Sequence, residues 1–135
     1  MRRTVVLLAT MVLTLLVASG VALAVTKIGT DGPDFLMGTR GSDELFGRGG
    51  SDRINGRPGD DVILGGPGDD ILIDGPWHEV AVDTLMGGDG NDLFYANNRP
   101  AARDIVGCGA GGHDIAIVDR KDIVSDDCER IRHSP

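Results

Sequence analysis

Aspartates recur at a fixed place in a glycine-rich repeat, and they are the residues best suited to chemistry in this chain. Six of them occupy equivalent positions: Asp34, Asp43, Asp52, Asp61, Asp70 and Asp92. Two residues before each stands a glycine, and these are Gly32, Gly41, Gly50, Gly59, Gly68 and Gly90. The repeats contain no His or Cys, so the candidate ligands are carboxylate and carbonyl oxygens. Such a donor set selects a hard cation, and loose multi-oxygen turns suit Ca2+ better than Mg2+.

The repeat is nine residues long. Five contiguous units fill Gly29 to Ile73, reading GTDGPDFLM, GTRGSDELF, GRGGSDRIN, GRPGDDVIL and GGPGDDILI, and a sixth, GGDGNDLFY, fills Gly87 to Tyr95. All six have Gly at positions 1 and 4 and Asp at position 6. Glycine permits a positive φ in a tight turn and leaves backbone carbonyls uncovered. Position 8 is always a large apolar residue, which a three-residue strand can point inward. The inward set is Leu36, Leu45, Ile54, Ile63, Leu72 and Phe94.

Stacking such units creates an electrostatic problem. Position-6 carboxylates two repeats apart lie on the same side of the stack, about one strand spacing (~4.8 Å) from each other. Two unit charges at that distance repel by roughly 3.5 kcal/mol at an effective dielectric constant near 20. Several pairs would exceed the stability of a small domain, about 5–15 kcal/mol. The sequence therefore predicts cations between adjacent turns, at least three per chain, with the position-5 residue Asp60 on the solvated surface.

The pattern resembles the RTX, or haemolysin-type, calcium-binding nonapeptide G-G-x-G-x-D-x-U-x over Gly29 to Tyr95. The resemblance implies an all-β fold, a right-handed parallel β-roll (solenoid) that binds several Ca2+ ions. Two nonapeptides would make one turn of the roll, with six residues in each ion-binding turn and three in each strand. The chain looks most like the small secreted RTX-repeat proteins of actinobacteria. It departs from the pattern at position 2, where Thr30, Thr39, Arg48 and Arg57 replace Gly, and weaker or less regular sites are expected there.

Residues 74–86 read as one repeat with four extra residues. Asp83 and Leu85 keep positions 6 and 8, whereas Ala81 replaces the turn glycine, so any ion there is expected to bind weakly. Trp77 and His78 are expected to bulge from the roll. Trp77 either contacts a glycan or a partner, or folds back to cover the roll.

Beyond Tyr95 the pattern decays, and the sequence predicts a β-roll over 25–106 followed by a C-terminal capping segment over 107–135. A solenoid needs such a cap because its last coil exposes core and backbone. Cys108 and Cys128 are the only cysteines and are expected to form a disulfide in an exported protein. The alternative, a metal site that adds His113 with or without His78, lacks C-x-x-C or H-x-H spacing.

The N-terminus has the features of a secretory signal peptide over 1–24. Met1-Arg2-Arg3 is basic, Val5 to Ala18 is apolar apart from two threonines, and Ala22-Leu23-Ala24 fits an A-x-A cleavage site. The alternative is an uncleaved anchor over Val5 to Val25, which is long enough to span a bilayer. Cleavage predicts a secreted protein that is extracellular or in the cell envelope. Membrane attachment is expected only if the segment is retained.

Composition narrows the function classes. The 18 Asp against 3 Glu argue against helical bundles, and the net charge of −8 argues against nucleic acid as a partner. The adjacent carboxylates Asp60-Asp61 and Asp69-Asp70 sit within turns rather than across a substrate cleft, so no enzyme activity is predicted. The leading hypothesis is a secreted protein that folds on binding calcium. The alternatives are a calcium-dependent adhesion or glycan-binding module at the cell surface, and an accessory of a separately encoded secreted enzyme.

Overall fold

The computed structural model describes residues 23–76, 78 and 80–135. The predicted signal peptide falls almost wholly outside these residues, and so does Trp77. The described part of the chain contains twelve strands and no helix. It accordingly offers no helix able to cross a membrane.

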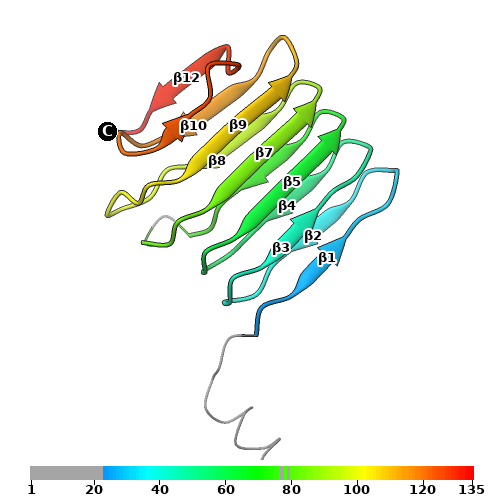
Figure 1. The fold of residues 1–135 in the computed structure, drawn as a ribbon, viewed down its shortest axis with the longest axis horizontal. Helices are drawn as coiled ribbons and strands as arrows, with labels where there is room; N and C mark the ends of the chain where they lie inside the picture. The colour runs from blue at the N-terminus through cyan, green and yellow to red at the C-terminus, as the bar shows by residue number, and fades with distance from the viewer. Residues whose placement is uncertain (1–22, 77, 79) are drawn as a thin grey trace, which may run out of the picture.

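The strands form two parallel sheets of six strands each, and successive strands alternate between them (Figure 1). One sheet has the order β1 (Thr26–Ile28), β3 (Glu44–Phe46), β5 (Val62–Pro67), β7 (Thr84–Asp89), β9 (Ile105–Ala110) and β11 (Ile123–Val124). The other has the order β2 (Phe35–Met37), β4 (Arg53–Asn55), β6 (Ile71–Ile73), β8 (Leu93–Ala96), β10 (Ile115–Val118) and β12 (Arg130–His133). The chain therefore winds as a β-solenoid of about six coils, which confirms the predicted parallel roll.

The register shows how the repeat builds the coils. Leu36 pairs with Ile54, eighteen residues or two repeats further on. Ile63 pairs with Leu85, twenty-two residues further on, so the four extra residues of 74–86 leave the strand register intact. Asp83 and Leu85 thus keep the positions that the sequence predicts for them.

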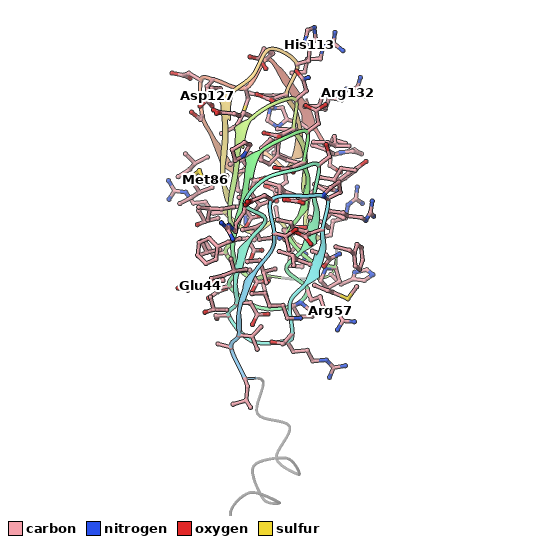
Figure 2. The ribbon with its side chains drawn as sticks, turned by 90° about the vertical axis from the view of Figure 1, so that its right-hand side faces the viewer. Glu44, Arg57, Met86, His113, Asp127 and Arg132 are labelled. Carbon is pink, nitrogen blue, oxygen red and sulfur yellow. A yellow bond between two sulfur atoms is a disulfide. The ribbon has the colours of Figure 1, made fainter. Side chains whose placement is uncertain are left out.

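The core is a narrow column between the two sheets. Because side chains alternate along a strand, the middle residue of each three-residue strand points inward. These position-8 side chains are fully buried from Leu45 to Phe94, and the column continues through Val106 and Ala116. Residues at positions 7 and 9 face outward, as Glu44 and Met86 do along the flank of the roll in Figure 2.

Charged residues protect the two open ends of the sheets, where an edge strand could pair with another chain. At the N-terminal end, Lys27 takes the inward place opposite Leu45, and its Nζ donates a hydrogen bond to the carbonyl oxygen of Met37 at 2.6 Å. At the C-terminal end, β12 carries Arg130 and Arg132 and is exposed throughout.

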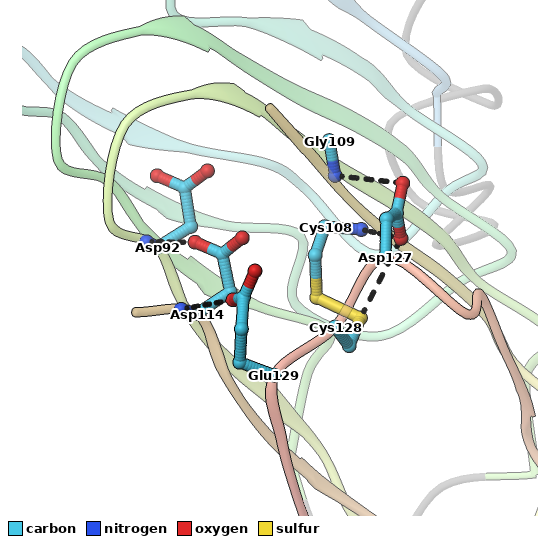
Figure 3. Close-up of a disulfide and its surroundings, with 7 residues drawn as sticks. All are labelled: Asp92, Cys108, Gly109, Asp114, Asp127, Cys128 and Glu129. Atoms are coloured by element: carbon cyan, nitrogen blue, oxygen red, sulfur yellow. Dashed lines mark hydrogen bonds between the residues drawn. A yellow bond between two sulfur atoms is a disulfide. The ribbon is translucent and has the colours of Figure 1, made fainter. Parts of the chain in front are cut away.

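A disulfide joins Cys108 in β9 to Cys128 just before β12, with a Cα–Cα distance of 5.1 Å (Figure 3). The predicted disulfide is confirmed, and the alternative metal site on these cysteines is excluded. The neighbouring Asp127 accepts hydrogen bonds from the backbone N–H groups of Cys108 and Gly109 at 3.3 and 3.1 Å. The predicted boundary between roll and cap falls inside β9, and β10 to β12 continue the two sheets.

Candidate calcium-binding turns

An acidic residue stands immediately before every strand except β1, which follows Val25. Because strands 15 to 22 residues apart pair with each other, these acidic residues stack into two rows, one beside each sheet. The Asp43 row contains Asp43, Asp61, Asp83, Asp104 and Asp122. The Asp34 row contains Asp34, Asp52, Asp70, Asp92, Asp114 and Glu129.

Each row is held by hydrogen bonds between successive coils. The Oδ1 atom of each Asp accepts a bond from the backbone N–H of the acidic residue one coil earlier, over eight Asp–Asp contacts of 2.7–3.1 Å. Figure 3 shows two steps of the Asp34 row, from Asp92 to Asp114 and from Asp114 to Glu129. The contact explains the fixed position of Asp, since its side chain reaches back to the coil before it.

The second oxygen of several of these carboxylates is buried and unsatisfied. Oδ2 has no hydrogen-bond partner in Asp52, Asp70, Asp83, Asp92 and Asp114, and each of these residues is at most 2% exposed. Buried polar atoms nearly always have a partner, because leaving one without costs free energy. Buried, unpartnered carboxylate oxygens fit a bound cation at each of these turns.

The position-1 glycines bring carbonyl oxygens to the same place. A Cβ added to Gly47 would lie 2.2 Å from Oδ2 of Asp52 and 2.6 Å from the carbonyl oxygen of Gly65, one coil further on. The carboxylate and the carbonyl thus face one space that stays open because position 1 has no side chain. Oxygen atoms of these two kinds are the usual ligands of Ca2+. The residues present therefore fit the ion.

Four of the six position-4 glycines predicted as ligands have a conformational role in the structure, and Gly32 and Gly41 do not share it. Gly50, Gly59, Gly68 and Gly90 have φ between 97° and 140°, a region that other residues rarely adopt. A Cβ on Gly68 would lie 2.0 Å from the carbonyl oxygen of Gly50. Their part in binding an ion stays a prediction. The sequence reasoning did not name the position-1 carbonyls as ligands, although the invariant Gly at position 1 was the available signal.

The four departures at position 2 fall into two kinds. The Thr30 hydroxyl donates to Oδ2 of Asp34 at 2.9 Å, and Thr39 donates from its hydroxyl and its N–H to the carboxylate of Asp43. These two turns satisfy their own carboxylates. Arg48 and Arg57 instead adopt φ of 81° and 75°, the conformation that glycine takes at this position in later repeats. The sequence predicted a departure in all four turns, and the structure distinguishes their causes.

Comparison with known families gives one match. A family model described as the RTX calcium-binding nonapeptide repeat, four copies long, matches residues 28–63, 48–75 and 81–98. The chain therefore contains RTX calcium-binding nonapeptide repeats over these residues. RTX repeats bind Ca2+, and β-roll modules of this kind are typically structural rather than catalytic. No curated protein and no solved structure matches the chain.

The sequence predicted six position-6 aspartates as ligands, and the structure places all six in the Asp34 row or the Asp43 row. It also adds members beyond them. Asp83 keeps position 6 in the insertion but was not included in the candidate site, and Asp104 and Asp114 lie beyond Tyr95, where the pattern decays. Asp122 and Glu129 were missed, because the nine-residue frame has decayed there. For Asp122 the remaining signal was an acidic residue directly before the short apolar stretch Ile123-Val124, whereas Glu129 precedes Arg-Ile-Arg and had no such signal.

Burial gives Asp70, Asp83 and Asp92 a high proton affinity when no ion is bound. It raises the pKa of Asp83 to about 8, that of Asp92 to about 7 and that of Asp70 to about 6. The negative charges of the neighbouring aspartates raise each pKa further, against backbone hydrogen bonds that lower it. In the absence of calcium, protonation neutralises these buried carboxylates and removes the repulsion between them.

Acid is therefore expected to stabilise the calcium-free roll. These aspartates have raised pKa values in the folded state, so between about pH 4 and pH 8 the folded chain binds more protons than the unfolded chain. The free energy of unfolding then falls as the pH rises through that range. Calcium-stripped protein should show more β-structure by circular dichroism at pH 5 than at pH 8.5. The variant Asp83→Asn/Asp92→Asn should flatten this dependence, and an equal or larger β signal at pH 8.5 in the unaltered protein would contradict it.

Proposed function

We propose that this chain is a secreted calcium-binding protein whose β-roll folds as several Ca2+ ions bind between stacked turns. The observation that carries the proposal is the set of buried, unpartnered Oδ2 atoms along the two rows. Eight Asp–Asp contacts bring carboxylates together between successive coils, which supports a count of at least three ions. Calcium concentrations of roughly 10⁻⁴–10⁻³ M, the range of extracellular modules, are expected to suffice.

Export is the second part of the proposal. The basic Met1-Arg2-Arg3, the apolar Val5 to Ala18 and the Ala22-Leu23-Ala24 site together favour a signal peptide cleaved after Ala24. The disulfide supports an oxidising compartment, since such bonds persist outside the cytosol. Small secreted actinobacterial RTX proteins remain the type that the chain most resembles. The role is proposed to be structural, in the cell envelope or the surrounding medium, and not enzymatic.

A calcium-dependent adhesion or glycan-binding role would use the outer faces of the roll. The sheet that contains β5, β7, β9 and β11 has four exposed apolar side chains, which are Val62, Met86, Ile105 and Ile123. Trp77, the residue best suited to a sugar ring, lies outside the described residues. A glycan array read with and without Ca2+ tests this role, and an accessory role beside a secreted enzyme would appear as a partner recovered from culture supernatant.

The ligand assignment is tested with two aspartates from neighbouring positions. Asp52 is buried between Asp34 and Asp70 in its row, and Asp52→Asn should weaken the ion sites on both sides. Asp60 is exposed and accepts only a backbone hydrogen bond from Val82, at 2.9 Å, among the contacts of the described residues. Equilibrium dialysis at limiting calcium should show fewer ions bound per Asp52→Asn chain.

Asp60→Asn is the matched control, because it makes the same chemical change at the adjoining repeat position. It should bind as many ions as the unaltered protein. Equal losses in the two variants would mean that position 6 is not the ligand position. Absence of bound calcium in the unaltered protein would contradict the proposed function itself.

A further inference from the structure

The insertion places an aspartate where the regular repeats have a glycine. Asp74 stands at position 1, directly after β6, and its backbone continues the roll. A Cβ on Gly56 would lie 2.5 Å from the carbonyl oxygen of Asp74, much as a Cβ on Gly47 would lie 2.6 Å from that of Gly65. Asp74 therefore keeps the backbone role of a position-1 glycine and adds a carboxylate.

That carboxylate joins two members of the Asp43 row. Asp74 is 4% exposed, and Asp83 and Asp104 are fully buried. One carboxylate oxygen from each of the three lies within 4.8 Å of the other two.

An independent sign of a ligand comes from Asp83. Its Oδ1 accepts the N–H of Asp61 at 2.7 Å, whereas its Oδ2 is buried and has no hydrogen-bond partner. The other two carboxylates also accept hydrogen bonds. Asp74 accepts the N–H of Gly75 at 2.6 Å. Asp104 accepts the N–H of Asp83 at 2.9 Å and the side-chain amide of Asn98 at 3.3 Å. A fully buried and unpartnered oxygen thus lies among three converging carboxylates, which is the environment of a bound cation.

We propose that Asp74, Asp83 and Asp104 form a separate calcium site that binds more tightly than the sites between regular turns and fills first. The inference rests on the proposed function, because it concerns the same ion. Affinity for Ca2+ rises with the number of charged ligands and with the rigidity of the site. Three buried carboxylates meet here, and strands on both sides fix Asp83 and Asp104. The proposal reverses the expectation from Ala81 that the insertion binds an ion weakly.

The test is a calorimetric calcium titration of the purified protein and three variants. The unaltered protein should bind one ion at least tenfold more tightly than the others. Asp74→Asn preserves size and removes charge, so it should lose this tight step and keep the weaker ones. Asp74→Gly restores the residue of the regular repeats, and its ion at this turn should join the weaker class.

Asp69→Asn is the control for net charge. Asp69 is exposed, accepts the N–H of Asn91 at 2.8 Å and lies outside the cluster, so this variant should keep the tight step. A tight step that survives in both Asp74 variants, or a single class of sites in the unaltered protein, would overturn this inference alone. Failure of the unaltered protein to bind any calcium would overturn the proposed function as well.

Discussion

Gly47→Ala is expected to disrupt the centre of the roll, although it adds one methyl group. That methyl would lie 2.2 Å from Oδ2 of Asp52 and 2.6 Å from the carbonyl oxygen of Gly65, and the strands on either side hold both atoms in place. The overlap alone should cost about 1–3 kcal/mol of unfolding free energy. The methyl would also occupy the space that we assign to an ion, so stability gained from calcium should be lost there. Urea unfolding at saturating calcium, together with a count of bound ions, measures both effects.

Gly49→Ala provides the comparison within the same turn. A Cβ on Gly49 would be no closer than 3.6 Å to its nearest neighbour, Asp31, and this glycine does not have a positive φ. The control should unfold within about 0.5 kcal/mol of the unaltered protein, as mutations away from strained or packed features usually do. If both variants lose the same stability, glycine is invariant at position 1 because of its backbone properties and not because of the open space beside Asp52.

Removal of the Cys108–Cys128 disulfide is expected to cost about 3 kcal/mol, the chain-entropy value for a loop of this size. The effect should be concentrated in the last coil. β11 has only two residues, and β12 is exposed and pairs along one edge with β10, so little side-chain packing holds these strands besides that pairing. Cys108→Ala/Cys128→Ala should therefore increase amide hydrogen exchange in β10 to β12 at saturating calcium.

The same exchange experiment contains its own reference. β3 to β6 lie several coils from the disulfide, and their exchange at saturating calcium should change much less. Uniformly faster exchange along the roll would indicate that the disulfide supports the whole solenoid. Unchanged exchange in β12 would contradict its role in holding the last coil.

The strands and their register could be predicted from the sequence because the repeat encodes them locally. Position 8 marks the inward side chain, and positions 1 and 4 mark the turns, so a nine-residue frame fixes both sheets. The same frame correctly carried Asp83 and Leu85 across four inserted residues. The frame predicted these positions correctly because the extra residues lie in the loop before Asp83 and leave the strand itself unchanged.

Other features depend on contacts between coils, which a repeat pattern does not contain. Thr39 and Arg57 both replace glycine at position 2. Thr39 donates to the carboxylate of Asp43 in the same repeat, whereas Arg57 adopts a positive φ. Asp74 looks like a loop residue in sequence, and only the winding of the chain brings it to Asp83 and Asp104. Glu129 joins a row through a longer side chain and outside any nine-residue frame.

The central claim is that the two carboxylate rows make the fold depend on calcium. Neighbouring carboxylates about one strand spacing apart repel by roughly 3.5 kcal/mol per pair at an effective dielectric constant near 20, and the rows contain eight such Asp–Asp contacts. That repulsion exceeds the roughly 5–15 kcal/mol by which a small domain is stable. Calcium, or protons at lower pH, must relieve it.

The most direct measurement is far-ultraviolet circular dichroism of the purified protein at pH 8, titrated with calcium from excess chelator. The account predicts a largely disordered spectrum in chelator and a cooperative gain of β-structure at roughly 10⁻⁴–10⁻³ M free Ca2+. Magnesium at the same concentrations should give much less β-structure, because it demands a smaller and more regular oxygen shell. Identical β-rich spectra in chelator and in excess calcium would contradict the account.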